Sequence, residues 1–226
     1  MGHALIPRTL LLSVSDSTHY NRKDMISVGT INVVESLEVV TELDCTTTID
    51  DWLPCVTTPI ITTNNGSSCL MIQCNVYDWT LAGFIFDITK TYCLHTELHL
   101  QNMSFGYIRF GFIDNYDTLD VNNAHIIEYT NENGYKWNKV TRTNGNDTLI
   151  STAFQGKQIK YNDWIDVDFL IDKGEIYASF TTCNNEEITE QYVGTMDYDF
   201  CFAMSSWINR TRGITCRKFE VTEILD

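Results

Sequence analysis

The stretch Asp163–Thr181, DWIDVDFLIDKGEIYASFT, decides the fold class of this chain. Apolar side chains alternate with polar ones up to Asp172, and the alternation resumes after Gly174. A period of two is typical of β-strands with one buried face. Gly174 accepts a positive φ, so the Asp172-Lys173-Gly174 segment supplies a tight turn. The stretch therefore predicts a β-hairpin.

The same period recurs on both sides of this hairpin. Residues Phe105–Ile113 and Tyr198–Trp207 alternate in the same way, and a final strand holds Phe219 and Val221. The Thr-rich segment Cys45–Asn65 contains two prolines and is typical of turns around short edge strands. Many strands joined by polar turns, with little helical periodicity, predict an all-β fold, an antiparallel two-sheet sandwich.

The N-terminal quarter has a different pattern from the rest. The segment Ile31–Leu43 fits one face of a helix, but its valines favour a strand, so both alternatives stay open. We therefore expect residues 1–54 to form an N-terminal extension, either a separate module or a segment packed on the sandwich. Residues 55–226 are expected to form the sandwich.

Composition limits the classes of partner. The 226 residues carry a formal charge of −15, which opposes general binding to nucleic acids and anionic membranes. No apolar run approaches a membrane span or a signal peptide, so a cytoplasmic protein is expected. Most of the eight cysteines are then expected to be free thiols. A secreted chain with four disulfides is the alternative.

Several segments together resemble a SPRY domain over roughly residues 55–226. They are LHTELHL at Leu94–Leu100, FGFID at Phe110–Asp114, YNDWIDV at Tyr161–Val167, IYASF at Ile176–Phe180 and the aromatic strand Tyr198–Trp207. The resemblance implies a concanavalin-like jelly-roll sandwich that binds a partner peptide through loops on one face. It implies no chemistry and no cofactor.

Two groups of residues are candidate metal or catalytic sites. Cys93, His95, Glu97 and His99 share one face of a predicted strand and could hold zinc, with His125 as a remote ligand. Asp163, Asp166 and Asp168, with Glu175 across the turn, could hold calcium or form a glycosidase carboxylate pair. Neither strand alone offers a complete ligand set, so we expect no stoichiometric metal and no catalysis.

Aromatic and arginine side chains in predicted loops are the candidate binding residues. Such side chains dominate the energetics of protein interfaces. The candidates are Tyr116, Tyr135, Trp137, Trp207, Arg210 and Arg212. The sequence thus predicts a non-enzymatic module that recognises a protein or peptide. A carbohydrate-binding lectin on the same architecture is the first alternative, and a glycoside hydrolase is the second.

Overall fold

The structure of the chain is a computed structural model. It describes residues 36–54, 58–72, 79–100, 106–114, 123–130, 136–150, 164–181, 187–208 and 213–225. Across these ranges the secondary structure consists of β-strands and turns. Among the same residues we find no helix of the length and hydrophobicity that crossing a bilayer requires.

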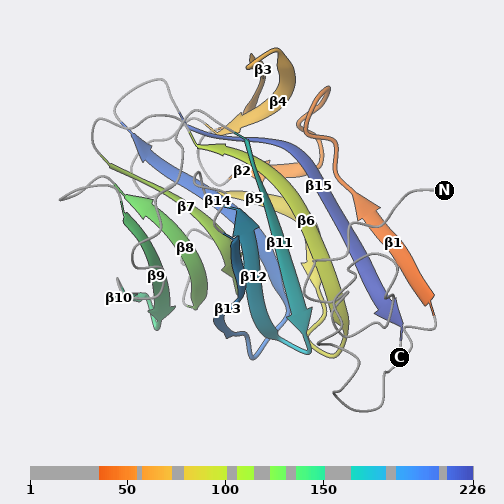
Figure 1. The fold of residues 1–226 in the computed structure, drawn as a ribbon, viewed down its shortest axis with the longest axis vertical. Coiled ribbons are helices and arrows are strands. Elements are labelled where there is room, and N and C mark those ends of the chain that lie inside the picture. Colours follow the sequence, from red (N-terminus) through yellow and green to blue (C-terminus); the bar gives the residue numbers. More distant parts are fainter. Residues whose placement is uncertain are drawn as a thin grey trace.

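Two antiparallel sheets make up the fold, as the sequence predicted (Figure 1). In spatial order, the eight-stranded sheet contains β13 (Glu187–Thr195), β12 (Glu175–Thr181), β11 (Trp164–Asp172), β6 (Thr91–Leu100), β15 (Ile214–Leu225), β4 (Ser67–Ile72) and β3 (Ile60–Asn64), with β1 (Ser36–Glu42) also paired to β15. The seven-stranded sheet contains β10 (Asn146–Ile150), β9 (Lys136–Thr143), β8 (Ala124–Thr130), β7 (Gly106–Ile113), β14 (Phe200–Ile208), β5 (Thr80–Phe86) and β2 (Trp52–Pro54).

The predicted hairpin is confirmed. Strands β11 and β12 pair from Val167 opposite Phe180 to Asp172 opposite Glu175, which leaves a two-residue turn. Lys173 and Gly174 both have positive φ, 49° and 87°. Positive φ at both central residues defines a type I′ turn, whose twist matches that of the strands it joins.

Residues 36–54 belong to both sheets. Strand β1 pairs antiparallel with the C-terminal half of β15, and β2 pairs with β5. The two chain segments Ser36–Glu42 and Ile214–Leu225 therefore lie side by side (Figure 1). The segment Ile31–Leu43, which fitted both helix and strand, is strand from Ser36 onward. The sandwich thus includes strands N-terminal to the expected boundary at residue 55.

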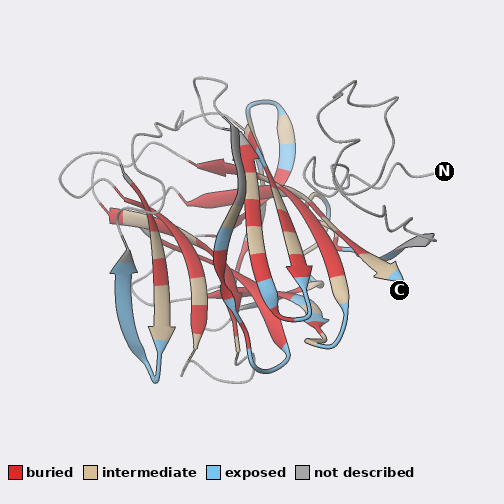
Figure 2. Ribbon diagram, turned by 60° about the horizontal axis from the view of Figure 1, so that its bottom comes forward, coloured by how far each residue is buried: buried red, intermediate tan, exposed pale blue. Residues whose placement is uncertain are grey.

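The core lies between the sheets and is rich in aromatic rings. Buried residues alternate with exposed or partly exposed ones along β11 and β12, which produces the banding visible in Figure 2. Phe112 of β7 meets Phe169 of β11 across the interface, with ring centroids 5.0 Å apart. Edge-to-face packing of this kind adds to the burial of apolar area, so the aromatic layer holds the two sheets together.

The five described cysteines are buried free thiols: Cys45, Cys69, Cys93, Cys201 and Cys216. Burial raises the pKa of Cys93 and of Cys69. The pKa of Cys45 is raised by its contact with Cys216, whose Sγ lies 3.6 Å away, and by burial. Because the thiolate is the reactive form, these groups are expected to be inert in the folded chain.

Alkylation should therefore depend on unfolding. We expect at most three of the eight cysteines to react with iodoacetamide in the native chain, and all eight after denaturation without reductant. Intact mass spectrometry counts the adducts. Eight sulfurs that stay blocked after denaturation would instead show disulfides and favour the secreted lectin.

Candidate functional site

A second buried cluster lies on the face of the seven-stranded sheet that points away from the core. It consists of apolar residues from β5, β7, β8, β9 and β14 and from Trp79: Trp79, Leu81, Ile113, Ala124, Ile126, Val140, Cys201 and Ala203. Alternation places these side chains opposite the core-facing ones of the same strands. The outer face of this sheet is therefore partly covered and partly apolar.

Polar side chains cross the same outer face from strand to strand. Arg109 of β7 is in register with Glu128 of β8, which is in register with Asn138 of β9. Arg142 of β9 is opposite Asp147 of β10. We call these five residues the polar row. Each of them alternates along its strand with a core-facing residue and so lies on the outer face.

The polar row is joined by hydrogen bonds. Arg109 Nε donates to Glu128 Oε2 at 2.8 Å, and Arg109 Nη1 donates to Asp147 Oδ2 at 3.2 Å. Arg142 Nε donates to the other oxygen of Asp147 at 2.6 Å. Asn138 Nδ2 donates to Glu128 Oε1 at 3.0 Å. Asp147 is thus held between two guanidinium groups, which fixes its orientation before any ligand arrives.

Charge pairing favours the ionised forms of Arg109 and Asp147. Burial opposes the charge of Arg109, but Glu128 and then Asp147 outweigh it, so the pKa of Arg109 is raised. Burial likewise opposes the charge of Asp147, but the hydrogen bond from Arg142 and the charge of Arg109 hold its pKa below the usual value. Two positive and two negative side chains leave the row without net charge.

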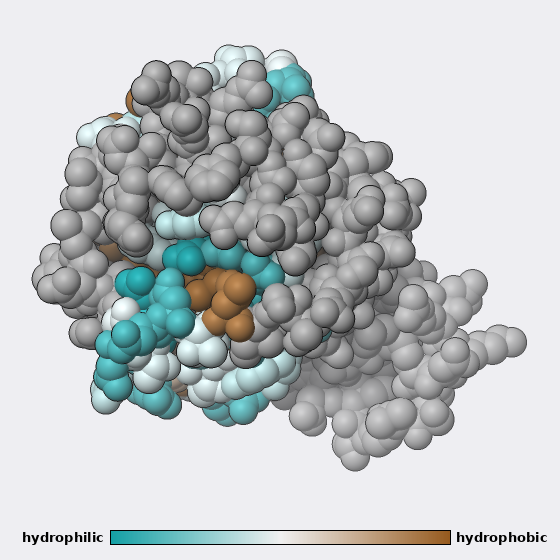
Figure 3. Space-filling view, turned by 90° about the vertical axis from the view of Figure 1, so that its left-hand side faces the viewer, coloured by the Kyte–Doolittle hydropathy of each residue, from teal (hydrophilic) through white to brown (hydrophobic). Residues whose placement is uncertain are grey.

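One end of the row is accessible and the other is not. Glu128 and Asn138 are buried, and Asn138 Oδ1 has no hydrogen-bond partner in the described part of the chain. Asp147 lies on β10, which is exposed, and Leu149 two residues later is 56% exposed on the same face. Figure 3 shows a side of the molecule at which hydrophilic surface borders a small hydrophobic patch. At this end of the row, a ligand can therefore contact the carboxylate of Asp147 and the apolar side chain of Leu149 together.

Trp137 does not lie in a loop, and this corrects the prediction for that residue. It belongs to β9, is 2% exposed and packs between Tyr129 of the same sheet and Phe180 of the opposite sheet. Its polar neighbours in sequence suggested a loop, but they alternate with it along a strand. The ring has no surface left for a ligand.

Of the other predicted binding residues, the structure describes only the backbone of Trp207. The backbone of Trp207 lies in β14, in register with Tyr107 of β7. Tyr116, Tyr135, Arg210 and Arg212 lie outside the described residues. The loop-binding prediction for these residues therefore stays a prediction.

Strand pairing brings together members of the two candidate metal groups that the sequence indicated. β6 and β11 are neighbours, so His95 and Glu97 lie beside Asp168 and Asp166 on the outer face of the eight-stranded sheet. Glu175 lies at the turn between β11 and β12, away from this cluster, and accepts a hydrogen bond from the Tyr177 hydroxyl. His125 lies in the other sheet, where its Nε2 is 2.8 Å from the Thr195 carbonyl oxygen. Asp163 is outside the described residues.

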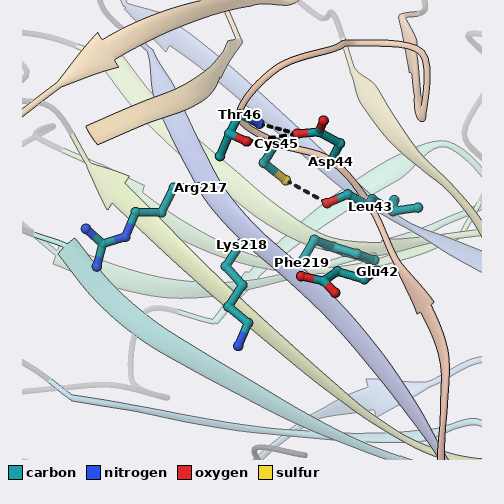
Figure 4. A pocket seen from close by; sticks show the side chains of 8 residues that line it. All are labelled: Glu42, Leu43, Asp44, Cys45, Thr46, Arg217, Lys218 and Phe219. Carbon is teal, nitrogen blue, oxygen red and sulfur yellow. Dashed lines mark hydrogen bonds between the residues drawn. The ribbon is translucent and has the colours of Figure 1, made fainter. Parts of the chain in front are cut away.

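A pocket of about 310 Å³ opens where the chain leaves β1 (Figure 4). It is lined by Glu42, Leu43, Asp44, Cys45, Thr46, Arg217, Lys218 and Phe219. Hydrogen bonds from the Thr47 hydroxyl and from the backbone N–H groups of Thr46 and Thr47 lower the pKa of Asp44 to about 2. The Asp44 carboxylate is thus occupied by hydrogen bonds within its own turn.

Comparison with known proteins identifies the fold and no family. No family model matches the chain. A search of curated proteins also finds no match.

Solved structures do resemble it. The CBM2 module of the evolved Dit of Lactobacillus casei BL23 phage J-1 has a TM-score of 0.54 at 8% identity and covers 84% of this chain and 97% of that one. Lectin II from Ulex europaeus has a TM-score of 0.54 at 6% identity, covering 84% and 99%. The same lectin complexed with galactose has a TM-score of 0.52 at 6% identity, covering 83% and 100%.

The class is therefore a concanavalin-like β-sandwich, as found in lectins and carbohydrate-binding modules. Because the sequence identities are only 6–8%, the structural similarity establishes the fold and says nothing about the ligand. The resemblance to a SPRY domain falls inside this class, and its narrower assignment stays a prediction.

Proposed function

We propose that this protein is a non-enzymatic binding module whose ligand is a neutral carbohydrate, bound at the exposed end of the polar row. One observation carries the proposal. Asp147 is held between Arg109 and Arg142, and Leu149 is exposed on the same strand face. A sugar ring combines hydroxyl groups with apolar C–H surfaces, and this arrangement offers a partner for each.

Charge supports a neutral ligand. The two guanidinium groups of the row are matched by Glu128 and Asp147, so no excess positive charge is available for an acidic sugar or a phosphate. The whole chain carries a formal charge of −15, which repels polyanions at long range. Hydroxyl recognition by preorganised charged groups needs no net charge.

The galactose complex of the Ulex lectin makes galactose a reasonable first probe for this sandwich.

Asp147→Asn is expected to weaken carbohydrate binding by about tenfold or more. The substitution keeps the shape but removes the charge that both arginines hold, and hydrogen bonds to charged groups contribute about 1.5–3 kcal/mol. Neutral glycans, galactose and galactose oligomers first, are screened on an array. The best binder is then titrated calorimetrically against wild type and variant.

Asp172→Asn is the matched control. It is the same substitution on an exposed residue of the opposite sheet, where Asp172 accepts a hydrogen bond from Thr91. It should leave glycan affinity unchanged. The proposal is withdrawn if no neutral glycan binds, or if the glycan that binds does so equally well to the Asp147→Asn chain.

Peptide recognition is the second candidate, and a different feature favours it. β10 is an edge strand of the seven-stranded sheet, and its described side chains are exposed. An extended peptide can add to such an edge through backbone hydrogen bonds. A peptide selected from a displayed library would favour this candidate if its binding is lost in Leu149→Asp but retained in Asp147→Asn.

A further inference from the structure

A polar cluster on the outer face of the eight-stranded sheet combines an imidazole with carboxylates from two strands. Asp166 and Asp168 of β11 are in register with Glu97 and His95 of β6. One ligand atom from each of His95, Glu97 and Asp166 can be chosen so that all three lie within 4.8 Å of one another. The cluster is on the opposite sheet from the polar row and does not depend on the proposed function.

His95 is oriented by a second carboxylate. Its Nδ1 lies 2.7 Å from Asp168 Oδ1, and a carboxylate in this position accepts the Nδ1 proton. In the neutral ring the lone pair is then on Nε2. That atom belongs to a residue only 5% exposed and has no hydrogen-bond partner among the described residues. A buried acceptor is thereby aimed into a group of acidic side chains.

Glu97 is oriented from the other side. Arg217 Nε donates to Glu97 Oε2, while Glu97 Oε1 lies 3.9 Å from His95 Nε2. The guanidinium also lies 4.3 Å from the centre of the Trp164 ring, which limits its freedom. One oxygen of Glu97 is therefore held by Arg217 and the other faces the imidazole.

The charges of the cluster favour a divalent cation. With His95 neutral, three ionised carboxylates and one guanidinium leave two net negative charges. Asp166 lies beside the like charges of Glu97 and Asp168 on the outer face of the sheet. An ion of charge +2 beside Asp166 removes this unfavourable repulsion.

We propose that His95 Nε2, Glu97 and Asp166 bind a zinc ion, with Asp168 and Arg217 as positioning residues. An imidazole with two carboxylates is a zinc-type ligand set, and a water molecule would complete four-coordination. Calcium takes oxygen ligands only, so the imidazole argues against it. The hydrogen bond from a metal-binding histidine to a carboxylate is the usual way in which its free nitrogen is directed at zinc.

The geometry needs only side-chain rotation to close around the ion. Zinc bonds of about 2.0–2.2 Å place neighbouring donors about 3.4 Å apart in a tetrahedral site. Asp166 is exposed and Glu97 is partly exposed, so both can move toward the fixed His95 Nε2. The sequence predicted no metal because neither strand alone has enough ligands for zinc. Pairing of β6 with β11 adds Asp166 to His95 and Glu97 and so supplies three protein ligands.

The test is a zinc titration of the full chain after chelator treatment, in competition with a chromophoric chelator. We expect one ion per chain. Asp166→Asn and His95→Gln are expected to weaken zinc binding by about 100-fold or more, since each removes a direct ligand. Asp168→Asn is expected to weaken it by about 10–100-fold, the usual effect of losing a histidine-orienting carboxylate. Cobalt(II) in place of zinc should give the intense visible absorption of a tetrahedral site.

Asp172→Asn is the matched control, because Asp172 lies on the same strand and the same face but outside the cluster. It should retain wild-type zinc affinity. Melting temperatures check that each variant is folded, and the exposed Asp166 carries the test if His95→Gln fails to fold. The proposal is overturned if folded wild type binds no zinc, if Asp166→Asn and Asp172→Asn bind it equally, or if calcium is preferred over zinc.

Discussion

Trp137→Ala is expected to lower the free energy of unfolding by about 3–5 kcal/mol, the usual range for truncating a fully buried large aromatic residue. The ring is 2% exposed, and its centroid lies 5.1 Å from that of Phe180 and 5.2 Å from that of Tyr129. Because Phe180 belongs to the opposite sheet, the substitution opens a cavity at the interface between sheets. Urea unfolding followed by tryptophan fluorescence and circular dichroism measures the change.

Two further variants separate a core role from a binding role. Trp137→Phe should retain much of the stability, since it keeps a ring in the site and Trp137 Nε1 has no described hydrogen bond to lose. Tyr198→Ala removes an aromatic ring that is 68% exposed and should change stability by less than about 0.5 kcal/mol. Wild-type stability in Trp137→Ala would refute the core placement and restore this residue as a ligand-contact candidate.

Gly111→Ala is expected to destabilise the chain by about 3 kcal/mol or more. Gly111 lies in the middle of β7 with a φ of 153°, a conformation that other residues rarely adopt. An added Cβ would lie 2.3 Å from the carbonyl oxygen of His125 on β8, and a backbone atom in a sheet has little room to move. The cost therefore combines backbone strain with separation of two paired strands. Urea unfolding again gives the free energy.

Gly145→Ala is the matched control for this effect. Gly145 also has a positive φ, 77°, but an added Cβ would meet nothing within 4 Å. Only the backbone strain remains, so we expect the free energy of unfolding to fall by about 1 kcal/mol. Equal losses in the two variants would mean that the close approach of β7 to β8 contributes nothing.

Much of the fold was readable from the sequence because strand alternation is a local property. The alternation of Ile165, Val167 and Phe169 with aspartates fixed which side of β11 faces the core, and all three are buried. Arg109 lies between the buried residues Ile108 and Phe110 of β7, so the same alternation puts it on the outer face. Asn144-Gly145 is an Asn-Gly pair typical of two-residue hairpin turns, and it lies in the β9–β10 hairpin that brings Asp147 opposite Arg142.

The candidate site was less predictable because its residues come from different strands. Arg109 meets Glu128 at 19 residues' separation and Asp147 at 38. Which strands become neighbours depends on how the whole core packs, and a single sequence contains no local signal for that choice. Trp137 shows the same limit: its polar neighbours suggest a loop, and only the packing of the two sheets buries it.

The sequence by itself determined the all-β class, the hairpin at Lys173-Gly174 and the inner and outer faces of β11. Those features follow from backbone geometry over a few residues. Only the tertiary structure decided that β1 pairs with β15 and that β6 lies beside β11. His95 and Asp168, 73 residues apart, meet because antiparallel pairing aligns them in one register, and register is fixed by burial of the opposite faces of both strands.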